Sequence, residues 1–158
     1  MKGEQLMAIL FASAGRRVQL INCFRQDATA LGVSLRVHAV DMRPELSAAC
    51  QVADQSWCVP RCTSVDYVPS LLEICQHEQI DLLVPTIDTE LHILARKQKE
   101  FAAIGTRVTI SSPDVVEIAR DKLQTAQFLA RHDLPVPRTE MLADFLARPE
   151  DWHWPVIL

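Results

Sequence analysis

Long hydrophobic runs are missing from this sequence, which argues against a protein that spans a membrane by helices. No stretch approaches the roughly 20 consecutive apolar residues that a membrane-spanning helix requires. Residues 6–12 are apolar, follow a lysine and end at the first residue of Ala12-Ser13-Ala14, which imitates a secretory signal with its cleavage site. The apolar core is short, however, and cleavage there would remove the first expected strand. We therefore predict neither a membrane segment nor secretion.

A surplus of basic residues is also missing. The 158 residues include 16 Lys and Arg against 20 Asp and Glu, which gives a formal net charge of -4. Proteins that bind the phosphates of nucleic acid usually carry the opposite balance. The composition thus predicts no nucleic-acid partner.

The cysteines lack the spacing of a disulfide framework or of a zinc site. There are five, an odd number, scattered through apolar sequence. This usage favours reduced thiols and a cytoplasmic location. Cys58, Cys62 and His77 are candidate metal ligands, but no second close Cys/His pair completes a set of four. We predict no metal site, and we assign no role to the five histidines.

Apolar runs of strand length do occur, and they alternate with helical patterns. The expected strands are residues 6–12, 35–41, 56–60, 81–86 and 107–111, and helical periodicity begins near residues 18, 66 and 91. Single helices between strands imply crossover connections and hence parallel pairing. We predict an α/β fold, a Rossmann-like doubly wound parallel sheet with helices on both faces.

The pattern changes after Ser112. Two helices are expected at residues 113–120 and 121–132, and two prolines within residues 134–139 then interrupt the pattern. We therefore predict a Rossmann-like domain over residues 1–112, followed by connector helices and the start of another domain over residues 113–158.

The loops after the strands are where a parallel sheet binds its ligands. The loop after the first strand, residues 13–17, combines a hydroxyl, a glycine and two guanidinium groups, which suits phosphate or carboxylate. The alternative is that Gly15 only makes the turn and both arginines are solvated. Asp88 and Glu90 either cap the helix that begins there or face the cleft and hold a substrate amine.

Glycine is scarce, and this bears on a further alternative. Asp41 ends a strand, as the ribose-binding acid of dinucleotide folds does, so a nicotinamide-dependent oxidoreductase has to be considered. The dinucleotide fingerprint needs three glycines in the first turn, and this turn has Gly15 alone. The oxidoreductase hypothesis is therefore disfavoured.

Several stretches together resemble the ATP-grasp ligases, in particular the branch like the large subunit of carbamoyl-phosphate synthase. The matching stretches are "ILFASAGRRVQLINCF", "AVDMRPELSAACQVAD", "IDLLVPTIDTEL", "VTISSPDVVEIARDKLQTAQFLARHDLPVPRT" and "WPVIL". One departure is Asp133, where relatives commonly have glycine before the P-x-P stretch; Asp tolerates turn conformations.

The resemblance implies a pre-ATP-grasp domain that binds the substrate, followed by the beginning of the ATP-grasp domain. Relatives use ATP and Mg²⁺, and the lysine of their "DK" motif, here Lys122, contacts ATP phosphate. The expected substrate is a small carboxylate or amine. The residues expected to face it are Ser13, Gly15, Arg16, Asp41, Thr86, Asp88, Glu90 and Ser111.

The last residues, 156–158, resemble the first half of a strand that continues in relatives. We therefore interpret the chain as truncated, inert by itself, without tight cofactor binding, and able to form a homodimer through its C-terminal segment. The alternative is a free-standing Rossmann-like module that binds a small anionic metabolite or nucleotide.

Overall fold

The computed structural model describes residues 5–157. The chain divides into two compact units, Met1–Pro113 and Asp114–Leu158. Each unit is described by itself.

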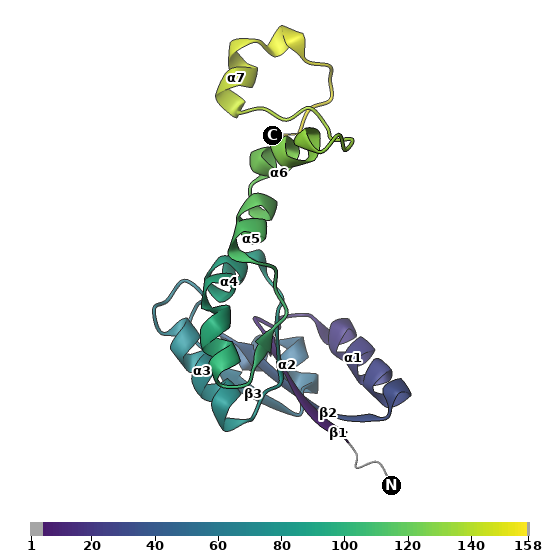
Figure 1. Ribbon diagram of the computed structural model, residues 1–158, viewed down its shortest axis with the longest axis vertical. Helices are drawn as coiled ribbons and strands as arrows, with labels where there is room; N and C mark the ends of the chain where they lie inside the picture. The colour runs from purple at the N-terminus through teal and green to yellow at the C-terminus, as the bar shows by residue number, and fades with distance from the viewer. Residues whose placement is uncertain (1–4, 158) are drawn as a thin grey trace. The chain divides into compact units, whose positions relative to one another are not determined.

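The first unit is built on a five-stranded parallel sheet (Figure 1). Its strands are β1 (Gln5–Ala12), β2 (Val33–Asp41), β3 (Gln55–Cys58), β4 (Leu82–Pro85) and β5 (Arg107–Val108). Their order across the sheet is β3-β2-β1-β4-β5, and every pair is parallel. Phe11 of β1 is opposite Ala39 on one side and Val84 on the other. The predicted doubly wound parallel sheet is confirmed.

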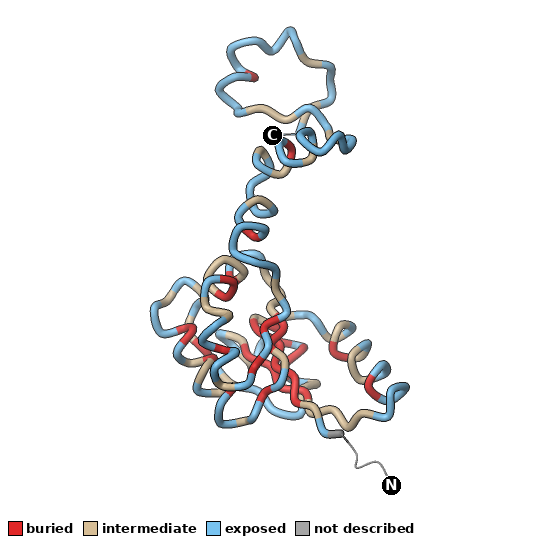
Figure 2. Tube along the Cα trace, viewed as in Figure 1, coloured by how far each residue is buried: buried red, intermediate tan, exposed pale blue. Residues whose placement is uncertain are grey.

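Helices cover both faces of this sheet. The helices are α1 (Val18–Leu31), α2 (Ala48–Val52), α3 (Tyr67–His77) and α4 (Asp88–Ala103). Ile9 and Phe11 of β1 belong to the core under α1 and α2, whereas Leu10 belongs to the core under α3 and α4. Because β1 is covered on both sides, its sequence is a continuous apolar run instead of an alternating one. Figure 2 shows burial concentrated along the strands.

Two short elements between β2 and β3 were not predicted. They are a 3-10 turn, η1 (Pro44–Leu46), and α2. Ser47 caps α2, since its Oγ accepts a hydrogen bond from the N–H of Cys50 at 3.3 Å. A helix this short has too few residues to show helical periodicity in the sequence.

The last two strands are shorter than predicted. β4 was expected over residues 81–86, but Asp81 instead accepts a hydrogen bond from Ala8 N at 2.7 Å and Thr86 turns toward the end of β1. β5 was expected over residues 107–111. Thr109 N still donates to Leu83 O at 2.9 Å, but Ile110 N turns back to Val108 O at 3.0 Å and the strand ends.

The second unit contains helices and loops. The elements are α5 (Pro113–Arg120), α6 (Lys122–Arg131), α7 (Leu142–Ala147) and a 3-10 turn, η2 (Pro149–Asp151). Asp121 caps α6 by accepting from Gln124 N at 2.9 Å. Asp133 adopts φ +55°, the left-handed conformation in which glycine commonly follows a helix.

The strand expected over residues 156–158 is not formed in the described part of the segment, residues 152–157; Leu158 lies outside the described residues. A strand needs a neighbour for its backbone hydrogen bonds, and within this unit no described strand supplies one. Within residues 5–157, no helix combines the length and apolar character needed to cross a membrane.

Candidate functional site

The candidate site lies where β1 and β4 are neighbours. The chain leaves β1 for a helix on one face of the sheet and leaves β4 for a helix on the other, so this is the topological switch point. The Thr86 hydroxyl contacts Ala12 O at 3.0 Å and Ser13 O at 2.8 Å. The loops after β1 and β4 are thus joined directly.

A cavity of about 410 Å³ opens at this edge of the sheet. It is lined by Ser13, Asp41, Met42, Val59, Pro60, Arg61, Cys62, Thr63 and Ile87. Ser13 and Asp41 are the predicted site residues among them. The residues expected from the sequence come from the loops after the first, second, fourth and fifth strands, and none comes from the loop after the third. The same rule applied to that strand identifies residues 59–63.

Asp41 fixes the loop that carries Gly15. Its Oδ2 accepts from Gly15 N at 2.9 Å, and its Oδ1 accepts from Arg43 N at 3.3 Å. The N–H groups of Ala14 and Arg17 also have protein acceptors, Val40 O and Ala14 O, each at 3.0 Å. The N–H groups of Ala14, Gly15 and Arg17 are therefore committed to the fold, so side chains are the better candidates to hold a bound anion.

Glu90 is buried behind the cavity and does not line it. Its Oε2 accepts from Ser13 Oγ at 2.7 Å and from the Tyr67 hydroxyl. Its Oε1 accepts from Thr86 N at 2.7 Å and from Ile87 N at 3.2 Å. Of the two roles considered for Glu90, the geometry matches the helix cap. Burial first, and then the charge of Glu90, raises the pKa of Tyr67.

Ser13 owes its conformation to these contacts. Its φ of +48° lies in the left-handed region, which L residues other than glycine seldom adopt. The hydrogen bond to Glu90 and the contact of its carbonyl with Thr86 hold it there. Ser13 is the residue through which the buried network reaches the cavity.

The other predicted residues lie outside the cavity lining. Arg16 and Asp88 are exposed, and Asp88 is the first residue of α4. Ser111 is exposed, and its carbonyl accepts from Gln98 Nε2 at 2.8 Å. Lys122 is the first residue of α6 in the second unit. The structure therefore brings together Ser13 and Asp41 at the cavity, with Gly15, Thr86 and Glu90 positioning them.

The cavity offers two opposite charges against an apolar wall. Arg61 is exposed, and its guanidinium makes no hydrogen bond or ion pair with any of residues 5–157. Asp41 supplies the negative charge. Met42, Val59 and Ile87 supply apolar surface. Among residues 5–157, no group of three or more His, Cys, Asp or Glu side chains is placed to hold a metal ion.

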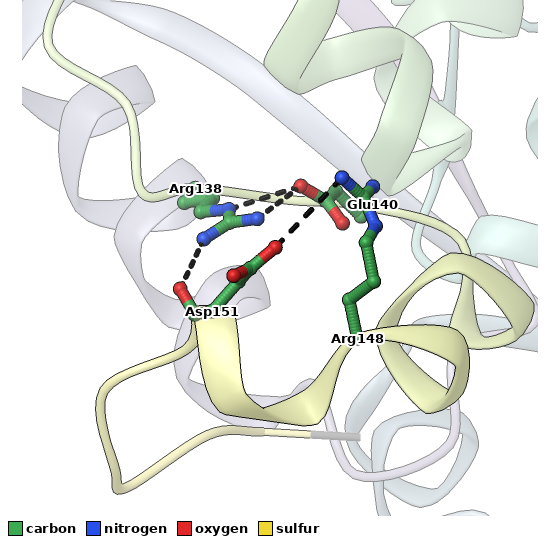
Figure 3. Close-up of polar contacts among 4 residues, drawn as sticks. All are labelled: Arg138, Glu140, Arg148 and Asp151. Carbon is green, nitrogen blue, oxygen red and sulfur yellow. Dashed lines mark hydrogen bonds and ion pairs between the residues drawn. The ribbon is translucent and has the colours of Figure 1, made fainter.

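A larger cavity, about 580 Å³, lies within the second unit. The guanidinium group in its lining, that of Arg138, already has hydrogen-bond partners within the unit (Figure 3). Arg138 donates to Glu140 Oε1 at 2.7 and 2.9 Å and to Asp151 O at 2.6 Å, and it lies 4.2 Å from the ring centre of Trp152. Because this arginine is occupied, we place the candidate site at the sheet.

Comparison with known proteins gives one family match. The family described as PylC-like, N-terminal domain matches residues 9–109, which is most of the first unit. No curated protein matches the chain significantly.

Solved structures resemble the chain in fold. The biotin carboxylase domain of a single-chain bacterial carboxylase has a TM-score of 0.62 at 19% identity, over 92% of this chain and 34% of that one. Pyruvate carboxylase from Rhizobium etli has a TM-score of 0.56 at 17% identity, over 85% of this chain and 13% of that one. Urea amidolyase from K. lactis has a TM-score of 0.60 at 14% identity, over 83% of this chain and 8% of that one. The chain thus spans about a third or less of these proteins, and identities this low show a shared fold alone.

Proposed function

This chain belongs to the PylC-like N-terminal domain family, and from this premise we propose that it is the substrate-side domain of an ATP-dependent carboxylate–amine ligase. In such a ligase ATP converts a carboxylate into an acyl phosphate and releases ADP. An amine or a related nucleophile then displaces the phosphate. The role proposed for this domain is to bind one of the two molecules that are joined.

The observation that supports this proposal is that Arg61 and Asp41 line the same cavity. A guanidinium binds a substrate carboxylate through two parallel hydrogen bonds. Asp41 already accepts two backbone N–H groups, and a carboxylate has further acceptor positions for an ammonium group. The apolar wall suits an aliphatic side chain. The cavity is therefore suited to a small molecule with both charges.

The cofactors of the parent enzyme are proposed to be ATP and Mg²⁺. Lys122 is the residue that the resemblance assigns to ATP phosphate. One charged contact contributes roughly 1.5–3 kcal/mol, which is small beside the cost of association. We therefore expect the 158-residue chain by itself to bind ATP weakly and to be inert. The assignment of residues 113–158 to the start of an ATP-grasp lobe stays a prediction.

The proposed site is tested on the 158-residue chain with L-leucine as probe, followed by NMR. Leucine should shift the side-chain signals of Arg61 and the methyl signal of Met42. Arg61→Ala should weaken binding at least tenfold, and acetate should bind more weakly than leucine. Arg16→Ala is the matched control, because Arg16 lies outside the lining. If Arg16→Ala weakens binding and Arg61→Ala does not, the loop after β1 is the anion site instead.

The parent activity is tested by ADP release from ATP with pairs of amino acids and amines in the enzyme that contains this domain.

The second candidate function is a free-standing module that binds a small anionic metabolite, which the guanidinium of Arg61, unpaired within the described residues, favours. Leucine binding without ADP release by any pair would support the module. Tight NAD binding would support the oxidoreductase, but the Gly15 N–H that a pyrophosphate needs donates to Asp41.

A further inference from the structure

His38 is a buried titratable residue that the candidate site does not use. It lies in β2, is 1% exposed, and is opposite Leu10 of β1 and Gln55 of β3. Its ring stacks on the indole of Trp57, with the ring centres 5.2 Å apart and the planes 9° from parallel. We call this contact the His38–Trp57 stack.

Neither nitrogen of the His38 ring has a hydrogen-bond partner among the described residues. Burial without such partners favours the neutral ring, and burial is the first cause that lowers the pKa of His38 from its ordinary value of 6.5. A neutral ring packs against the indole as an aromatic surface. A charged ring there has no acceptor for either N–H.

The charged groups that face the ring are Glu78 at the end of α3, Asp54 before β3 and Arg36 in β2. Both carboxylates have other partners. Glu78 Oε1 lies 2.8 Å from His77 Nδ1, and Asp54 accepts from Arg25 at 2.8 Å and from Val37 N at 2.7 Å. Arg36 opposes a second positive charge. Two other titratable groups, Cys75 and Tyr67, lie in the core against which Trp57 packs. Both are neutral, because burial raises the pKa of Tyr67 and raises that of Cys75 to about 12.

The His38–Trp57 stack lies at an edge of the sheet. Of the described strands, only β2 pairs with β3, over the four positions from His38–Gln55 to Asp41–Cys58. The chain then runs directly into residues 59–63, which line the cavity at the sheet. Any change that weakens the pairing of β3 with β2 therefore also weakens the hold on the first of these lining residues.

We propose that His38 makes this edge of the fold acid-sensitive: protonation of its ring releases Trp57 and separates β3 from β2. The ring cannot keep both its place under the indole and its new charge, because the charge has to reach water. Once Trp57 is released, the His38 ring can carry the proton and its charge can be hydrated by water. This inference stands apart from the proposed function, since it concerns the fold at β3 whether or not the cavity binds a substrate.

The direction of the pH effect follows from proton binding. The unfolded chain protonates His38 near pH 6.5, whereas the folded chain does so only at lower pH. Stability from this residue is therefore fully present above pH 6.5. It falls as the pH drops below that value, by at most tenfold in the unfolding equilibrium constant per pH unit for one proton. It becomes constant again below the folded pKa.

The test uses the full 158-residue chain and two readouts. The first is the NMR titration of the His38 ring Cε1–Hε1 signal, which should have its midpoint below pH 6.5. The second is fluorescence of a Trp152→Phe/Trp154→Phe variant, in which Trp57 is the sole tryptophan. Its emission should change with the same midpoint, and amide exchange in β3 should accelerate there before exchange in β1.

Two variants complete the test. His38→Leu removes the proton but keeps an apolar side chain, so the stability slope below pH 6.5 should become shallower by up to one proton. His153→Gln is the matched control, because His153 is exposed and belongs to the second unit, and it should keep the wild-type slope. A His38 midpoint at or above 6.5, or equal exchange in β3 and β1 at the His38 midpoint, overturns the proposal. These two readouts come from chains with His38 intact, so they decide the question even where His38→Leu fails to fold.

Discussion

The Tyr67 hydroxyl donates a hydrogen bond to Oε2 of Glu90, and both side chains are fully buried. Tyr67 begins α3 and Glu90 lies in the first turn of α4, so the bond joins the starts of the two helices that cover one face of the sheet. Tyr67→Phe keeps the ring and removes the donor. We expect a loss of about 1.5–3 kcal/mol in unfolding free energy, the usual contribution of a hydrogen bond to a charged group.

Urea unfolding measures this loss. Ser70→Ala is the control, since Ser70 lies on the same helix and its hydroxyl only donates to Asp66 O in the preceding turn. It should change stability by less than about 0.5 kcal/mol. A Tyr67→Phe variant as stable as Ser70→Ala means that the hydroxyl contributes nothing.

Glu90→Gln should be costlier than its small change in shape suggests. Four donors face the carboxylate, and the amide of glutamine turns one acceptor into a donor. We expect a loss of about 2–3 kcal/mol, together with shifted NMR signals for Ser13 and Thr86. Asp88→Asn, at an exposed position of the same helix turn, should cost under about 1 kcal/mol. Equal losses for the two variants would argue that only helix-dipole charge matters.

Gly15→Ala tests the turn after β1. Gly15 has φ +49°, and a Cβ there meets nothing nearer than Ser13 O at 3.7 Å, so strain in the backbone is the whole cost. We expect a loss of about 1–2 kcal/mol. Gly32→Ala, at φ +68° with open space, should cost about as much. Only Gly15→Ala should shift the amide signals of Gly15 and Arg43 that mark their bonds to Asp41, and unchanged signals would contradict this.

The thiols should differ sharply in reactivity. Burial raises the pKa of Cys75 to about 12, so almost none of its thiol is ionised at pH 8. Burial also raises the pKa of Cys50. Iodoacetamide at pH 8 should therefore modify the exposed Cys23 and Cys58 first, and Cys50 and Cys75 only in urea. Mass spectrometry identifies the labelled sites, and early labelling of Cys75 would show that the core opens readily.

Exposed apolar side chains in the second unit favour self-association. Leu146 is 65% exposed, Trp154 is 71% exposed and Ile157 is fully exposed. Such a surface gains free energy by meeting another like it. We expect light scattering to show concentration-dependent dimers that Leu146→Ser/Trp154→Ser weakens. Leu6→Ser, at an exposed apolar position of the first unit, should leave them unchanged.

Much of the first unit was predictable because its strands are buried on both faces. A continuous apolar run such as β1 differs plainly from the helical spacing that follows it, and the parallel order follows from the single helices between strands. The resemblance to the N-terminal part of ATP-grasp ligases agrees with the match to the PylC-like N-terminal domain family. α2 and β5 were harder to predict, because elements this short show no periodic pattern in the sequence.

The site was only partly predictable. Loop position alone placed Ser13 and Asp41 correctly at the strand ends, but it does not say which way a carboxylate points. Glu90 turns inward because Tyr67, distant in sequence, donates to it, and no local pattern contains that pairing. Arg61 follows the short strand β3, and none of the expected site residues comes from the loop after that strand.

The strand order also decides when the crevice can exist during synthesis. β1 is made first, yet one of its edges has no partner until β4 appears, since Phe11 pairs with Ala39 and then with Val84. Once β3 has been made, the partial sheet β3-β2-β1 has an open hydrophobic edge at β1. Ser13 meanwhile has no Glu90 to hold its turn. The cavity at the sheet therefore cannot be completed until β4 and the start of α4 have been made, and a pause in translation before residue 82 leaves the apolar edge of β1 open to aggregation.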